Sequence, residues 1–157
     1  MAKEDAVKSG LGGWLILVGL GVILTPFNYL STIPEFQSVF QDNLYDELVS
    51  VKPLFGPLIW TEIVVNIIFF LSSIYLIFLF FAKKTFFPKL FIWLALGSLV
   101  FVIVDAIVAG MIFKDMLTDE PFFDPETIKE IVRMSIQVII WVPYIMISKR
   151  VKATFVK

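Results

Sequence analysis

The sequence contains neither cysteine nor histidine in its 157 residues. The lack of cysteine excludes disulfides, thiolate nucleophiles and the membrane oxidoreductases that shuttle disulfides. The lack of histidine excludes imidazole acid–base catalysis and bis-histidine haem bundles, and both absences together exclude zinc sites of the usual type. Phosphate-binding loops, nucleophile elbows and clusters of metal ligands are missing too. We therefore expect no enzymatic activity, no cofactor, no metal site and no nucleic-acid partner.

Charge is also scarce, because charged residues make up 17% of the chain, whereas soluble proteins average about 25%. Hydrophobic residues instead reach 59%, and they are concentrated in four long runs. These runs cover residues 12–30, 58–82, 90–113 and 131–147. A membrane core about 30 Å thick needs about 20 helical residues to cross it, so the runs predict four transmembrane helices.

The ends of two runs need separate arguments. Asp124-Pro125-Glu126 supplies an N-cap, a proline and an early acid, which extends the short fourth helix back to residue 125. The first run follows Lys3 and Lys8, as in a signal peptide, but it lacks a cleavage site, so we expect a retained helix. The fold class is therefore an all-α membrane protein, a single domain over residues 1–157. Its four-helix transmembrane bundle is expected at residues 12–31, 58–82, 90–113 and 125–148.

The placement of basic residues predicts the orientation of the helices. Nine of the thirteen lysines and arginines fall on the side that holds both termini, and four fall on the other side. The four are Lys52, Lys114, Lys129 and Arg133. Because basic residues are retained on the cytoplasmic side, we expect both termini there and the loops 31–57 and 114–130 outside.

The first outer loop, residues 31–57, is long for so small a protein. Its apolar residues recur at helical spacing: Phe36, Val39, Phe40, Leu44 and Leu48. This pattern predicts an amphipathic helix on the outer membrane face. Two interpretations remain open for it, a lid that shields the bundle and a contact surface for another protein.

Five polar residues inside the predicted helices form the candidate site. They are Glu62 and Asn66 on the second helix, Asp105 on the third, and Arg133 and Gln137 on the fourth. A charged acid near the bilayer centre costs roughly 2.5–3.5 kcal/mol, so such residues are expected to face one another rather than lipid. Counted from the outer ends of antiparallel helices, Asn66 and Asp105 both lie about 12 Å deep. The five are therefore predicted to converge in the outer half of the bundle.

Two interpretations of this set compete. In the first, the polar groups join the helices, and Arg133 pairs with Glu62 or Asp105. In the second, they line a water-filled, outward-facing pocket whose carboxylates bind a proton, a cation or a basic ligand. One arginine does not neutralise two acids, which keeps the second interpretation open.

The two ends of the chain resemble a known family. The segment Gly10-Leu11-Gly12-Gly13-Trp14-Leu15 is similar to the G-x-G-G-W-L start of the bacterial domain of unknown function 2569. The segments 141–144 (WVPY) and 148–156 (SKRVKATFV) resemble the W-x-P-Y and S-x-R-V-K-x-T-F-V motifs near its end. The resemblance implies a bacterial inner-membrane protein and no particular activity.

Two hypotheses for function follow. The first is a non-enzymatic accessory or regulatory membrane component, whose partners would be the lipid bilayer and either another membrane protein or a second copy of the chain. The second is a small transporter or ligand-binding membrane protein that uses an outward-facing acidic pocket around Glu62 and Asp105. A ligand held between Glu62, Asp105 and Arg133 would favour the second.

Overall fold

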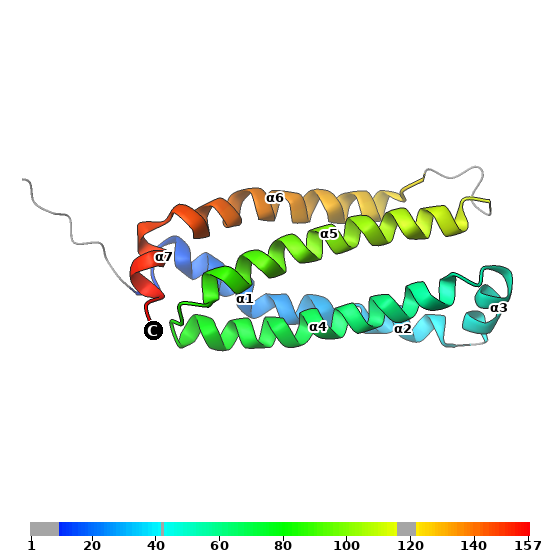
Figure 1. Cartoon of the computed structure of the whole chain (residues 1–157), viewed down its shortest axis with the longest axis horizontal. Helices are drawn as coiled ribbons and strands as arrows, with labels where there is room; N and C mark the ends of the chain where they lie inside the picture. The colour runs from blue at the N-terminus through cyan, green and yellow to red at the C-terminus, as the bar shows by residue number, and fades with distance from the viewer. Residues whose placement is uncertain (1–9, 42, 116–121) are drawn as a thin grey trace, which may run out of the picture.

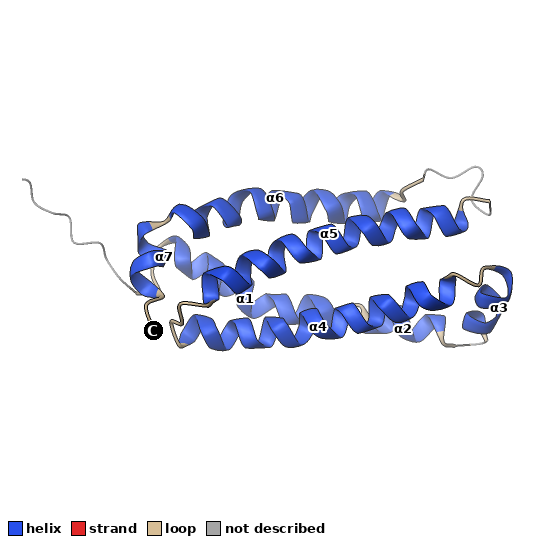
Figure 2. Cartoon of the chain, in the orientation of Figure 1, coloured by secondary structure: helices blue, strands red, loops and turns tan. Residues whose placement is uncertain are grey.

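The computed structural model describes residues 10–41, 43–115 and 122–157, which form helices joined by short loops (Figures 1 and 2). The helices are α1 (Trp14–Leu30), α2 (Ile33–Val39), α3 (Leu44–Val51), α4 (Phe55–Phe81), α5 (Phe87–Phe113), α6 (Pro125–Ile147) and α7 (Lys149–Thr154). The predicted all-helical bundle of four long apolar helices is confirmed. Lys3 and Lys8, used to predict the orientation, lie outside the described residues.

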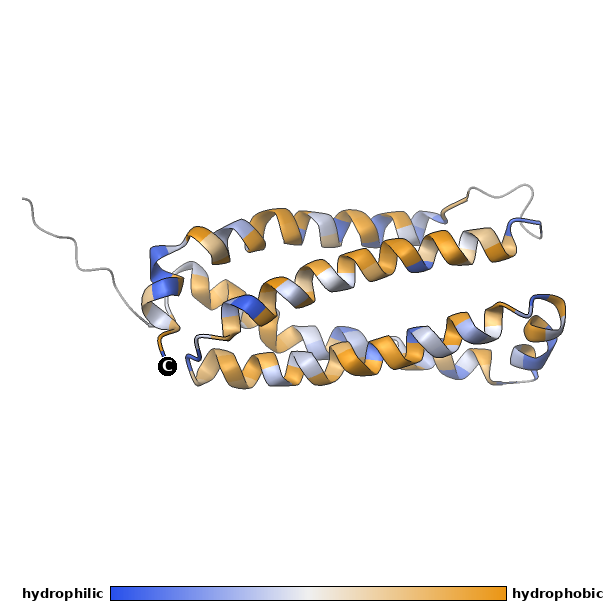
Figure 3. Ribbon diagram, viewed as in Figure 1, coloured by the Kyte–Doolittle hydropathy of each residue, from blue (hydrophilic) through white to orange (hydrophobic). Residues whose placement is uncertain are grey.

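The four long helices pack side by side in the order α1, α4, α5, α6, each against the next (Figure 1). In the part of the chain that the structure describes, four segments are long and apolar enough to cross a membrane: Trp14–Val39, Phe55–Phe81, Phe87–Phe113 and Pro125–Ile147. Hydrophobic residues cover most of their length, and hydrophilic residues gather on α3 and α7 at the two ends of the bundle (Figure 3). The chain is therefore a multi-pass membrane protein by the length and composition of its helices.

The helix starts show how proline and capping residues set the boundaries. α4 and α5 each begin three residues before the predicted start, because Pro57 and Pro88 lie in their first turns, where backbone N–H groups have no helical partner. At α6 the predicted cap is confirmed: Asp124 accepts hydrogen bonds from the backbone N–H of Glu126 at 2.8 Å and of Thr127 at 2.9 Å. The side chain and backbone of Thr127 hold the pKa of Asp124 below its usual range.

The first loop holds two short helices, α2 and α3, instead of the single helix that the spacing predicted. The chain turns before α3 at Asn43, whose φ of 62° is left-handed and interrupts a continuous helix. Phe40 and Tyr45 then stack at 5.1 Å, and the Trp60 indole N–H donates to the Tyr45 hydroxyl at 3.2 Å. These contacts attach the loop to the start of α4. They do not distinguish a lid from a contact surface for another protein, so both interpretations stay predictions.

The hydrophobic core lies toward the end of the bundle that holds α7, which we call the α7 end. Its members come from the start of α1, the end of α4, the start of α5, the end of α6 and the C-terminal segment. The buried cluster is Leu15, Val18, Val22, Phe69, Leu76, Leu79, Phe80, Phe87, Leu94, Ile145, Val151 and Phe155. The opposite end, which we call the α3 end, buries Phe55, Ile59 and Ile112. Between these two groups, residues 60–68 of α4 and 99–111 of α5 include no buried residue.

The two termini of the described chain meet at the α7 end (Figure 1). The Arg150 side chain donates to the carbonyl oxygen of Gly10 at 3.3 Å, and the Gly10 N–H donates to the Thr154 hydroxyl at 3.0 Å. A β-carbon on either Gly12 or Gly13 would lie 2.8 Å from a guanidinium nitrogen of Arg150. The two glycines therefore leave space for the guanidinium in this position, and a larger residue would displace it. We call this set of contacts the terminal latch.

The C-terminal segment also joins the α4–α5 hairpin. The Phe155 ring stacks on Phe87 with centroids 4.3 Å apart, and the Thr85 N–H donates to the Lys157 carbonyl at 2.8 Å. Phe155 is 5% exposed, so it is part of the hydrophobic core. The latch and this stacking together fix α7 across the end of the four long helices.

Candidate functional site

The structure places two of the five predicted site residues, Glu62 and Asp105, beside each other. Glu62 on α4 and Asp105 on α5 face each other across the helix interface, with their carboxyl groups within hydrogen-bonding reach. One turn along α4, the Asn66 amide donates to the backbone carbonyl of Glu62 at 3.0 Å. All three side chains are partly buried. They lie in the stretch of α4 and α5 that has no fully buried residue, between the two apolar ends.

Within the described ranges, no lysine or arginine forms an ion pair with this acid pair. The further charged group that acts on Glu62 is Glu35 of α2, which has the same sign. Among the described residues, ion pairs within 4.0 Å join Lys52 to Asp115 and Arg133 to Glu130. Neither Glu62 nor Asp105 therefore has a basic partner in that part of the chain.

Arg133 does not form the ion pair that was considered for it with Glu62 or Asp105. Its guanidinium lies 3.8 Å from Glu130, three residues earlier on α6, and its side chain is 71% exposed. The physical reason is proximity: residues three apart on a helix are neighbours, whereas the acid pair belongs to two other helices. The interpretation in which the polar groups join the helices therefore lacks the Arg133 ion pair on which it depended.

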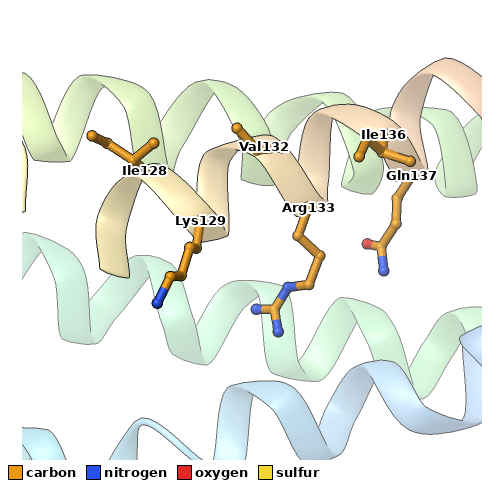
Figure 4. A pocket seen from close by; sticks show the side chains of 6 residues that line it. All are labelled: Ile128, Lys129, Val132, Arg133, Ile136 and Gln137. Carbon is orange, nitrogen blue, oxygen red and sulfur yellow. The ribbon is translucent and has the colours of Figure 1, made fainter. Parts of the chain in front are cut away.

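Gln137 accompanies Arg133 on α6. In Figure 4 both side chains, with Lys129, point from α6 toward the side on which α4 and α1 lie. Ile128, Val132 and Ile136 form a parallel row pointing away from them, and the two rows line a groove of about 420 Å³. Hydrogen bonds and ion pairs in the described chain link neither Arg133 nor Gln137 to the acid pair, so a single five-residue site stays a prediction.

Two polar features between the helices were not predicted from the sequence. The Tyr29 hydroxyl of α1 faces the Ser98 hydroxyl of α5, while its ring stacks on Phe69 at 5.8 Å. Tyrosine is common near the ends of transmembrane helices, so the position of Tyr29 in the sequence did not indicate this contact. Glu35 lies on α2 in the first outer loop, and the candidate site was drawn only from residues inside the predicted transmembrane helices.

The acid pair supports a narrow range of chemistry. Two carboxyl groups at this distance can share one proton or hold one cation, because two full negative charges repel each other. Within the described ranges, three acids do not come close enough together to hold a metal ion.

A family model described as a protein of unknown function (DUF2569) matches residues 8–156. No curated protein and no solved structure matches the chain. The two terminal motifs that carried the resemblance lie at opposite ends of the matched range, and the structure joins them in the terminal latch.

Proposed function

The chain belongs to the DUF2569 family of proteins of unknown function, and we propose that it is a non-enzymatic regulatory component of the bacterial inner membrane. Its state changes when the Glu62–Asp105 pair takes up a proton or a cation from the outer side. The observation that carries the proposal is the pairing of two partly buried carboxyl groups without a basic partner in the described chain. Both termini face the cytoplasm in this proposal, following the nine-to-four distribution of basic residues.

Desolvation destabilises the charged form of the Glu62–Asp105 pair. A carboxylate removed from water loses favourable solvation, and a second carboxylate beside it adds repulsion. A shared proton or a bound cation relieves both, so the occupied and empty states differ in stability. Because Glu62 and Asp105 belong to different helices, this difference acts directly on the contact between α4 and α5.

The packing at the α7 end and around the acid pair supports a regulatory role better than it supports transport. A transporter must open its binding site alternately to both sides of the membrane. Here the α7 end is closed by the buried core and by the terminal latch, whereas the acid pair lies in the part of α4 and α5 without fully buried residues. A site accessible from one side suits a sensor that passes its state to a neighbouring membrane protein.

The test uses the purified full chain in lipid nanodiscs and a probe cation, tetraphenylphosphonium. We expect the probe to raise the thermal unfolding temperature and to release protons, detected with a pH indicator in weak buffer. Glu62→Gln and Asp105→Asn should each abolish the proton release, because one neutral partner removes the shared proton. Glu47→Gln, an exposed acid on α3, is the matched control and should respond as the wild type does.

Two results would count against the proposal. One is a wild-type protein whose unfolding temperature is the same with and without the probe, and between pH 5 and pH 8. The other is proton release that persists in both the Glu62→Gln and the Asp105→Asn protein. Either result would make the pair a structural hydrogen bond.

A further inference from the structure

The groove on α6 has two chemically different walls, and neither wall includes Glu62 or Asp105. One wall is the apolar row Ile128, Val132 and Ile136, whose side chains are 47%, 51% and 52% exposed. The other wall is polar and includes Lys129 and Arg133 (Figure 4). Residues four apart lie above one another on a helix, so both rows run along the helix axis. A ligand in this groove would meet hydrocarbon on one side and two cationic groups on the other.

The charges beside the groove leave this cationic wall accessible. Glu126 and Glu130 belong to the same stretch of α6 but do not line the groove. Glu130 lies 3.8 Å from Arg133, and both side chains are substantially exposed, so their attraction is weak. A phosphate that accepts hydrogen bonds from Lys129 and Arg133 together can displace this contact.

The groove lies near the start of α6, where a helix that crosses a membrane passes the lipid headgroups. α6 begins at Pro125 after the polar Asp124 cap, so Lys129 and Arg133 lie about 6 and 12 Å along the helix axis. Long basic side chains at this depth extend toward the membrane interface. The apolar row then continues past Ile136 into the membrane span, where an acyl chain would follow it.

We propose that the α6 groove binds an anionic phospholipid. Its phosphate lies against Lys129 and Arg133, and its acyl chain runs along Ile128, Val132 and Ile136. The combination of walls is what selects such a lipid. A second groove, of about 580 Å³ on α5, is also mainly apolar but includes a single basic residue, Lys89, and so lacks the paired cations.

The experiment is native mass spectrometry of the full chain, released from detergent with equal amounts of a phosphatidylglycerol and a phosphatidylcholine of identical acyl chains. We expect the wild type to retain phosphatidylglycerol preferentially. Each of Lys129→Gln and Arg133→Gln should weaken phosphatidylglycerol binding about five-fold, the effect of one basic residue near an anionic headgroup. The double variant should bind both lipids alike, while thermal unfolding in detergent verifies that it is folded.

The matched control is Lys114→Gln, which removes an exposed basic residue at the end of α5, outside the groove. It should keep the wild-type preference. Equal binding of the two lipids by the wild type, or an equal loss in Lys114→Gln and Arg133→Gln, would overturn the proposal. So would a dimer that phosphatidylglycerol does not affect and that Arg133→Gln abolishes, because the groove would then be an interface between copies of the chain.

Discussion

The α7 end and the middle of the bundle toward the α3 end are built in opposite ways from the same helices. At the α7 end, apolar side chains from α1, α4, α5, α6 and the C-terminal segment form one buried cluster closed by the terminal latch. Nearer the α3 end, residues 60–68 of α4 and 99–111 of α5 have no buried member, and they carry Glu62 and Asp105. Segments with little buried apolar contact open most easily. We therefore expect stability to come mainly from the α7 end, and the proposed response to a proton or a cation to occur nearer the α3 end.

The largest expected effect is at Phe155, which stacks on Phe87 inside the α7-end core. Phe155→Ala should lower the free energy of unfolding by about 3–5 kcal/mol, because it removes a buried aromatic ring and leaves a cavity. Thermal or denaturant unfolding in detergent measures this loss. Phe81→Ala, at a ring that is 55% exposed, is the control, and an equal loss there would remove the contrast between core and surface.

The second-largest loss of stability is expected from changes in the terminal latch. Gly13 has a φ of 60°, and a β-carbon there would lie 2.8 Å from a nitrogen of Arg150. Gly13→Ala should therefore cost about 1–3 kcal/mol in unfolding free energy through backbone strain and displacement of Arg150. Gly21→Ala is the matched control, because the space around it is open and alanine favours helix. If both variants unfold alike, the latch does not contribute to stability.

A smaller effect is expected at the Asp124 cap, outside the membrane span. Asp124→Ala should cost about 1 kcal/mol, because two N–H groups of α6 lose their acceptor. Since the pKa of Asp124 is lower in the folded protein, its charge stabilises the fold above the unfolded pKa of about 3.9. That stability is lost as the pH falls through the folded pKa.

Asp124→Asn isolates this charge from the cap itself. Asparagine caps helices almost as well as aspartate but does not titrate. The variant should unfold like the wild type near pH 7 and should lose less stability than the wild type between pH 5 and pH 3. An identical acid response in both proteins would assign the loss to other carboxyl groups.

The smallest effect on stability is expected from Asp105→Leu. Because Arg133 pairs with Glu130, the change leaves no buried arginine without a partner, and it removes a like charge beside Glu62. The unfolding free energy should change by less than about 1 kcal/mol, while the response to the probe cation is lost. A large destabilisation would instead show that Asp105 holds the helices together.

Sequence reasoning predicted those features that depend on local pattern and helix geometry. Hydropathy and length were enough for the four long helices, and Asp124-Pro125 was enough for the start of α6. The helix inferences succeed because each depends on the pattern along one helix. Matching depths on antiparallel helices agree with the proximity of Glu62 and Asp105, whereas the convergence of all five polar residues stays a prediction.

The features that were not predicted depend on contacts between residues far apart in the sequence or on competition between possible partners, which a local pattern does not encode. The first loop divides at Asn43 because Phe40 and Tyr45 stack over Trp60, which is a tertiary preference. The partner of Arg133 could not be read from shared faces, because a helical neighbour competed with residues across the bundle. The latch joins residues 140 and 144 positions apart, so the two terminal motifs gave no separate sign that they meet.

Amide hydrogen exchange of the full chain in nanodiscs tests the division between the two regions most directly. With the probe cation, protection should increase in residues 60–68 and 99–111, and the segments around Phe87 and Phe155 should stay strongly protected throughout. In Asp105→Asn the increase should disappear. A cation response centred on the α7 end, or rapid exchange of that end in the absence of the cation, would contradict the account.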